Sequence, residues 1–285
     1  MNTTPSDTPV RVRLTGLAEL APSDLGPEDL RAWLTAPIAG EPLYKRALEV
    51  LLPLAILELV LEPGPASDTV LRLFEERPIY NLKARMAQNV RAVSPEHAAT
   101  LVVPLGGMLE ADLAGLVARG QRNGKLERTP VSSPGPEVNQ GTEIVYLPPG
   151  HSADEYDPST PPTDTYSPSP PILLRTGGSV KMRELAQRAL EGDLACSIQG
   201  VWRGDLLLGE AAEVDPSVRM IGKAAVGRGS VVEEGVILGH GAVVGEGCRV
   251  GTRAQLTHAM VLDGASVAAG EHILGLVRTP GGGDI

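Results

Sequence analysis

The sequence predicts a chain in two parts, an α/β domain followed by a parallel β-helix. The β-helix is predicted because every sixth residue from 214 to 274 is apolar, without a change of phase. A period of six fits neither the 3.6-residue repeat of an α-helix nor the alternation of an ordinary strand, and it is typical of a hexapeptide β-helix. The α/β domain is predicted because strand-like and helix-like segments alternate before residue 129.

The six-residue column is expected to stack inside the β-helix, with three hexads to each coil. Its members are Val214, Met220, Val226, Val232, Leu238, Val244, Val250, Leu256, Leu262, Ala268 and Leu274. Glycine often follows a member of the column, as at Gly227 and Gly245, and allows a backbone conformation that a Cβ would penalise. The same phase predicts an inner-corner position for His272.

Composition narrows the classes of function. The chain has 285 residues and a formal net charge of −10, with two Trp, five Tyr and one Phe. An acidic chain with few aromatic residues does not fit nucleic-acid binding, which needs basic patches and often stacking platforms. The start of the sequence lacks a signal-peptide core, and no apolar run reaches membrane-spanning length, so we expect a cytoplasmic protein. Richness in Ala, Gly, Pro and Arg is typical of a GC-rich bacterial genome.

The predicted domain organisation has three parts. Residues 1–9 form a disordered leader, residues 10–205 the α/β domain and residues 206–285 the hexapeptide-repeat β-helix. A Pro-rich excursion covers residues 129–171 and holds one strand, Glu143–Leu147. Cys196 and Cys248 offer neither a disulfide framework nor a metal cluster.

Within the α/β domain the apolar segments 10–14, 56–61 and 100–105 are expected as strands of a mostly parallel sheet. A helix is expected from Asn81 to about residue 92, and a strand over residues 194–199. Gly106 and Gly107 are expected to turn directly into a helix that carries Leu109. This glycine pair is either a plain turn or a place where a ligand approaches the carboxyl edge of the sheet.

Four stretches together resemble a known family. They are residues 36–43 (APIAGEPL), residues 101–113 (LVVPLGGMLEADL), residues 200–205 (GVWRGD) and residues 211–277. They are similar to segments of the sugar-1-phosphate nucleotidyltransferases, in particular the mannose-1-phosphate guanylyltransferase-like branch. The resemblance implies a Rossmann-like nucleotidyltransferase-type domain and a left-handed β-helix. It also implies a sugar-nucleotide ligand near Gly106, Gly107 and Trp202.

The chain departs from this family where catalysis takes place. The segment after Leu14 has no G-x-G and no basic residue before Arg31, whereas the family has a Gly-rich loop with an arginine. Trp33 stands in the place of the family's lysine. Gly107 and Gly204 stand in the places of its two metal-binding aspartates. Nucleotidyl transfer needs Mg²⁺ and cations to neutralise charge on the transferring phosphorus.

We therefore predict a catalytically degenerate relative, a pseudoenzyme, that has no catalytic residues, no metal site and no cofactor. It would act as a binding, regulatory or assembly subunit for a sugar nucleotide or sugar phosphate. The partner is either a second copy or an active relative, bound through the β-helix, and neither nucleic acid nor a membrane is expected. One alternative is an active, Mg²⁺-dependent nucleotidyltransferase in which Glu110, Asp112 or Asp205 replaces the missing acids.

A second alternative is a hexapeptide acyltransferase in which His240 removes a proton from the acceptor hydroxyl. His240 and His258 are separated by one full coil, so they are expected on the same corner of neighbouring coils; the other interpretation is a solvated corner. Trp202 has two interpretations as well. It stacks on a sugar or base, or it covers the open end of the β-helix.

Overall fold

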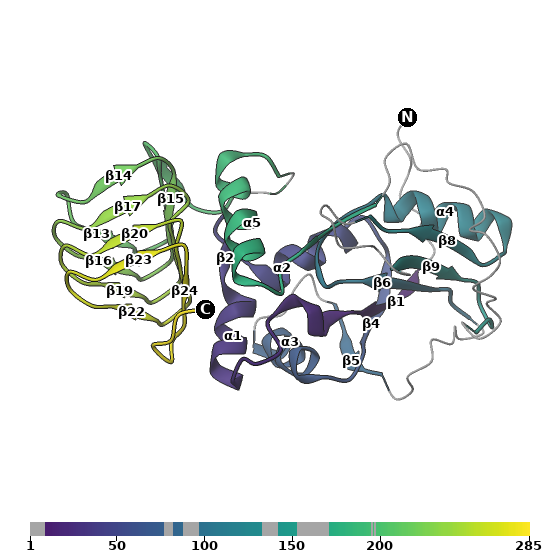
Figure 1. Cartoon of the computed structure of the whole chain (residues 1–285). Helices are drawn as coiled ribbons and strands as arrows, with labels where there is room; N and C mark the ends of the chain where they lie inside the picture. Colours follow the sequence, from purple (N-terminus) through teal and green to yellow (C-terminus); the bar gives the residue numbers. More distant parts are fainter. Residues whose placement is uncertain are drawn as a thin grey trace. The chain divides into compact units, whose positions relative to one another are not determined.

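The computed structural model describes residues 9–76, 82–87, 97–132, 142–152, 171–194, 196 and 198–285. The chain divides into two compact units (Figure 1). The first comprises residues 1–20 and 47–175, and the second comprises residues 21–46 and 176–285. The predicted leader falls almost wholly outside the described residues. The predicted domain boundary between residues 205 and 206 stays a prediction.

The first unit is built on a six-stranded sheet of order β5-β4-β1-β6-β9-β8 (Figure 1). Its strands are β1 (Val10–Thr15), β4 (Ile56–Leu61), β5 (Ala84–Met86), β6 (Thr100–Pro104), β8 (Glu127–Pro130) and β9 (Glu143–Leu147). The first four are parallel, whereas β9 runs antiparallel to β6 and to β8. Val12 and Leu14 of the central strand β1 are fully buried, as expected for a parallel strand with neighbours on both sides.

The other elements of this unit are η1 (Leu17–Leu20), η2 (Glu49–Leu51), α3 (Pro65–Glu76), α4 (Leu113–Asn123), β7 (Gly107–Glu110) and β10 (Ile172–Arg175). Strands β7 and β10 form an antiparallel pair. Helix α4 packs close to β9, because a Cβ on Gly120 would lie 2.2 Å from the ring of Tyr146. Gly124 ends α4 in the left-handed conformation, with φ of 60°.

Several sequence predictions for this region need correction. The helix expected from Asn81 is wrong at residues 84–86, which form β5 and pair with β4; Asn81 itself and residues 88–92 lie outside the described residues. Gly106 and Gly107 do not lead directly into a helix, because Leu109 lies in β7, whose pairing with β10 overrides the helix-like pattern. Residues 194, 196, 198 and 199 form no strand.

The first part of the second unit comprises α1 (Pro27–Thr35), β2 (Pro37–Ile38), β3 (Glu41–Pro42), α5 (Ser179–Glu191) and most of α2 (Leu43–Leu48). The turn between β2 and β3 needs glycine at residue 40, where φ is +86° and a Cβ would lie 1.8 Å from the carbonyl oxygen of Gln199. The buried guanidinium of Arg46 donates to the carbonyls of Ile38 and Ala39, at 2.9 and 3.2 Å.

The remainder of the second unit is the repeat region, residues 206–278 (Figure 1), and β11 pairs with the first strand of this region. Short parallel strands build three ladders, which the chain visits in rotation. The first ladder is β11 (Val201–Arg203), β12 (Leu206–Leu208), β15 (Ala224–Val226), β18 (Val243–Val244), β21 (Met260–Val261) and β24 (Val277–Arg278), of which β11 alone is antiparallel to its neighbour. The second is β13 (Glu213–Val214), β16 (Val231–Val232), β19 (Arg249–Val250) and β22 (Ser266–Val267). The third is β14 (Arg219–Ile221), β17 (Ile237–Gly239), β20 (Gln255–Thr257) and β23 (His272–Leu274). This arrangement fits a parallel β-helix.

The apolar column lies inside the repeat region up to Leu256, and then its phase changes by a single position. Val226 pairs with Val244, and Val244 pairs with Val261 rather than with Leu262, the member of the six-residue column. Leu256 likewise pairs with Ile273, which is 2% exposed, while Leu274 is 69% exposed. The prediction of one unbroken phase is therefore wrong beyond Leu256.

The shorter repeat has a local cause. The N–H of Ala225 donates to Ala242, and the N–H of Val243 donates to Ala259 in the next repeat. The turn before Ala242 contains His240 and Gly241, whereas the turn before Ala259 contains His258 alone, so the later repeat is one residue shorter at this corner. As a consequence of the shift, His272 is exposed rather than on an inner corner.

Candidate functional site

The first candidate site lies at the carboxyl ends of β1 and β6. Within the sheet, β4 and β5 follow β1 in the chain and lie on one side of it. The chain then returns to β6, which lies on the other side of β1. Open α/β sheets bind ligands at such a topological switch point. The N–H of Leu105 donates to the carbonyl of Thr15 at 2.8 Å, so these two strand ends are in direct contact.

The segment after β1 fills this edge with side chains of its own. Leu17 and Leu20 of η1 are buried, and the carboxylate of Glu19 forms an ion pair with Arg175 at the end of β10. A Cβ on Gly106 would lie 2.8 Å from the Cβ and from a carboxylate oxygen of Glu19, so glycine is needed there to admit that side chain. The edge thus presents an ion pair, in which the carboxylate of Glu19 neutralises the guanidinium of Arg175.

Gly107 also has a packing role. A Cβ on Gly107 would lie 2.0 Å from the carbonyl oxygen of Leu174, because β7 and β10 approach each other closely. Gly106 and Gly107 therefore both lie where the chain packs against itself, at Glu19 and Leu174 respectively. Their predicted role in substrate binding stays a prediction.

The three candidate replacement acids have different surroundings. Glu110 is exposed at the end of β7. Asp112 is the N-cap of α4 and accepts the N–H of Gly115 at 2.8 Å, so its carboxylate already stabilises the helix. Asp205 is exposed in the turn between β11 and β12, in the second unit. In the part of the chain that the structure describes, no group of three or more His, Cys, Asp and Glu side chains could hold a metal ion.

A shallow pocket of about 20 Å³ lies beside α4. It is lined by Ala111, Asp112, Leu113, Leu116, Arg119, Thr129, Ile144 and Pro171. Its two charged side chains both have partners, since Asp112 caps α4 and Arg119 pairs with Glu127 at 3.3 Å. The charges at this pocket therefore serve the fold of the first unit.

Trp202 lies on β11, opposite Leu207 of β12, and is half-buried. The ammonium of Lys223 lies 5.5 Å from its ring centroid and donates to the carbonyl of Leu190 at 3.1 Å. A cation held by the last turn of α5 thus already occupies one side of the indole. Trp202 thus lies at the start of the first ladder, and both interpretations of its role stay predictions.

His240 and His258 are stacked, with ring centroids 5.8 Å apart and an interplanar angle of 17°. Both side chains are exposed. Helix α5 lies beside this corner, because Arg183 donates to the carbonyl of His258 at 3.0 Å and a Cβ on Gly241 would lie 3.1 Å from Gln187. The expectation that the two histidines share a corner is confirmed.

Sequence reasoning missed two charged clusters. The Glu19–Arg175 pair joins residues 156 positions apart, and no local sequence pattern predicts it. Arg278 is buried with Glu271 and Asp284 as ion-pair partners. A signal for Arg278 exists, because it takes the place of Val261 one repeat further along the inward column of the first ladder.

The comparisons with known proteins supply no relative. No protein-family model matches the chain, and none of the curated proteins searched matches it. Among the described residues, no helix is both long enough and apolar enough to cross a membrane. The function must therefore be argued from the residues themselves.

Proposed function

We propose that the chain is a non-catalytic relative of the sugar-1-phosphate nucleotidyltransferases, with a left-handed β-helix, that acts as a binding or assembly subunit. The observation that carries the proposal is the ion pair of Glu19 and Arg175 at the switch point of the sheet. A Rossmann-like nucleotidyltransferase places cationic groups and backbone N–H groups at this edge to bind phosphates. Here the arginine at this edge, Arg175, is paired with the carboxylate of Glu19.

The strand order supports the comparison with this family only at the level of architecture. Four parallel strands with the switch point beside β1 form the expected frame for a nucleotide site. The packing roles of Gly107 and Asp112 argue for a frame without its catalytic acids. The proposed ligand is a sugar nucleotide or sugar phosphate, bound without turnover.

The test is calorimetry with GDP-mannose, UDP-glucose and the corresponding sugar phosphates on the intact chain. We expect binding of at least one ligand, and we expect Glu19→Gln to strengthen it about tenfold. The reason is that the variant removes a like charge near phosphate and releases Arg175, an effect of about 1.4 kcal/mol. Glu75→Gln on the exposed side of α3 is the matched control and should leave the affinity unchanged.

Two results would contradict this proposal. If no ligand in the panel binds to either the wild-type chain or the Glu19→Gln variant, the sugar-nucleotide part is wrong. If Glu19→Gln and Glu75→Gln change the affinity equally, the ligand does not lie at the switch point.

The exposed stack of His240 and His258 supports a second candidate, acyl transfer with His240 as the general base. Acyl-coenzyme A consumption in the presence of sugar acceptors tests it. This candidate predicts activity that is lost in His240→Ala and retained in His258→Ala. Equal activity of wild type and His240→Ala would rule it out.

A further inference from the structure

A buried arginine lies at the closing end of the repeat region, which is the end formed by β22, β23 and β24. In the first ladder Val226 pairs with Val244, Val244 with Val261, and Val261 with Arg278. Arg278 therefore takes the place on the inward column that valine takes in the preceding repeats. The residue is 7% exposed.

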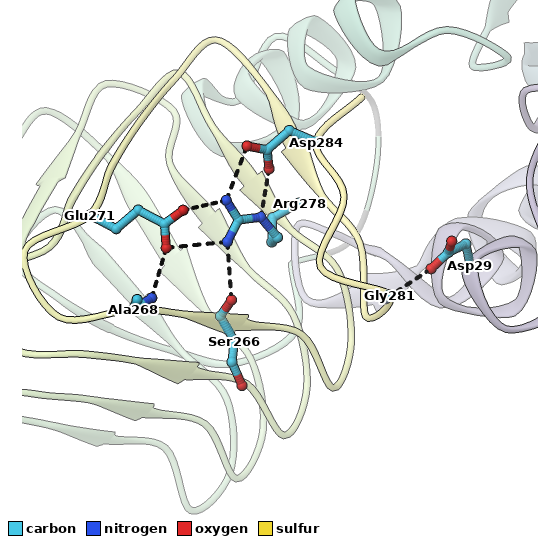
Figure 2. Close-up of polar contacts among 7 residues, drawn as sticks. All are labelled: Asp29, Ser266, Ala268, Glu271, Arg278, Gly281 and Asp284. Carbon is cyan, nitrogen blue, oxygen red and sulfur yellow. Dashed lines mark hydrogen bonds and ion pairs between the residues drawn. The ribbon is translucent and has the colours of Figure 1, made fainter.

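Figure 2 shows how this guanidinium is satisfied. It donates to both carboxylate oxygens of Asp284, at 2.6 and 3.0 Å, and to both carboxylate oxygens of Glu271. It also donates to the carbonyl of Ser266 at 3.3 Å. A buried charge needs such partners, and two carboxylates fix the side chain in one orientation.

The same cluster satisfies the edge of the second ladder. The N–H groups of Arg249 and Gly251 donate to the following repeat, so the matching groups of Ser266 and Ala268 point beyond the closing end. The N–H of Ala268 donates to Glu271 at 2.8 Å, and the carbonyl of Ser266 accepts from Arg278. The ion pair thus takes the place of a further strand at the N–H of Ala268 and at the carbonyl of Ser266.

At the edge of the first ladder, the backbone of residues 283 and 285 accepts the hydrogen bonds that a further strand would accept. In the preceding repeat, Met260 and Leu262 donate to the carbonyls of Leu276 and Arg278. The corresponding donors one repeat later are the N–H groups of Val277 and Thr279. These donate to the carbonyls of Ile285 and Gly283, at 3.1 and 2.9 Å, because residues 281–285 fold back beside β24.

The closing hairpin, residues 277–285, is also tied to α1. The N–H of Gly281 donates to the carboxylate of Asp29 in the first turn of this helix, at 3.3 Å (Figure 2). Both groups belong to the second unit. The hairpin is therefore held at one side by Arg278 and at its tip by Asp29.

At the opposite end of the repeat region, β11 covers the first ladder by pairing with β12, whereas the other two ladders begin with partly buried residues. Val214, Val218 and Met220 of the first repeat pack against the core but are only partly buried. An exposed strand edge has unpaired N–H and C=O groups, to which a strand of another chain can hydrogen-bond. At the second and third ladders, which begin with β13 and β14, the opening end of one copy has the strand spacing needed to extend the closing end of another.

We propose that the closing hairpin, locked by Arg278, is a cap that prevents the closing end from pairing with the opening end of a second copy. Such a contact is head-to-tail and does not close on itself, so it would produce chains of molecules rather than a dimer. The cap goes beyond the proposed function and does not depend on it, because it concerns assembly and not ligand binding.

The test removes the cap by deleting residues 280–285 and introducing Arg278→Leu. Sedimentation velocity should then show a series of species whose weight-average mass rises with concentration to about twice the wild-type value or more. Arg228→Leu is the matched control, because Arg228 also pairs with a glutamate, Glu246, but on the side of the repeat region. It should sediment as wild type does.

A mixing experiment distinguishes head-to-tail chains from non-specific aggregation. Excess wild-type protein should shorten the chains, because its opening end can bind an uncapped copy while its own closing end is blocked. The full-length variant Asp284→Lys, which repels Arg278, should show a weaker form of the same association.

Three results would overturn the cap. The first is an uncapped chain with native circular dichroism and wild-type mass. The second is an assembly that excess wild type does not shorten. The third is unfolding of both the deletion variant and Asp284→Lys, because residues 280–285 would then be part of the core and not a removable cap.

Discussion

Arg278 contacts both carboxylate oxygens of Glu271, and the arginine side chain is 9% exposed while that of the glutamate is 29% exposed. Asp284 approaches the same guanidinium from the returning chain, which lies beside β24. The three charged side chains form one cluster at the closing end of the repeat region. Their energetic contribution can be measured separately from assembly.

Arg278→Met should lower the free energy of unfolding of the second unit by about 2 to 3 kcal/mol, because two partly buried carboxylates lose their partner. Arg249→Met is the control, since Arg249 is 71% exposed and pairs with Glu233 at the surface. It should change stability by less than about 0.5 kcal/mol. Urea unfolding followed by tryptophan fluorescence reports on this unit, to which Trp33 and Trp202 both belong. Equal losses in the two variants would contradict the account.

The stability of the same unit should depend on pH. The hydrogen bond from Arg278 holds the pKa of Glu271 below its ordinary value of 4.5. A carboxylate with a lowered pKa in the folded state stabilises the fold above its unfolded pKa, and this contribution is lost as the pH falls through the folded value. Unfolding midpoints should therefore fall as the pH drops below about 4.5, and the fall should be shallower in Glu271→Gln. If the unfolding midpoints of wild type and Glu271→Gln fall with the same slope as the pH drops, Glu271 does not titrate in this way.

The change of phase in the repeat region makes opposite predictions for two neighbouring residues. Ile273 is 2% exposed, so Ile273→Ala should cost about 2 to 4 kcal/mol through a lost side chain and a cavity. Leu274 is 69% exposed, and Leu274→Ala should stay within about 0.5 kcal/mol of wild type. The same fluorescence measurement decides between them. A larger loss in Leu274→Ala would restore the unbroken six-residue phase.

Much of the fold could be predicted because its signals are local. The apolar column predicts the inward residues up to Leu256, and apolar runs predict β1, β4 and β6. The change of phase could not be predicted, because apolar residues stand in both phases beyond Leu256. Val261 precedes Leu262, Val267 precedes Ala268 and Ile273 precedes Leu274. Only the hydrogen-bonded register separates the two phases.

The candidate site was less predictable than the fold. The absence of a Gly-rich loop after Leu14 can be read from the sequence, but the residue that lies at the sheet edge instead cannot. Glu19 meets Arg175 only because β10 returns to pair with β7. Strand β5 was missed for a similar reason, since pairing with β4 and not its short sequence creates it.

Cys248 should not react in the native protein. Burial raises the pKa of its thiol to about 12, and the nearby charge of Asp263 acts in the same direction. At pH 8 only about one thiol in ten thousand would be the reactive thiolate. Native titration with a disulfide reagent should therefore find no rapidly reacting thiol in Cys196→Ser, whereas titration after denaturation should find one. Rapid native reaction of Cys196→Ser would show that Cys248 is accessible.

The central claim is that the edge occupied by Glu19 and Arg175 does not support nucleotidyl transfer. The most direct measurement is pyrophosphate release by the intact chain with Mg²⁺, a panel of nucleoside triphosphates and a panel of sugar phosphates. The account predicts no release above the protein-free control for any pair. Sustained release that requires both a nucleotide and a sugar phosphate, and that is lost in a variant of Glu110, Asp112 or Asp205, would contradict it.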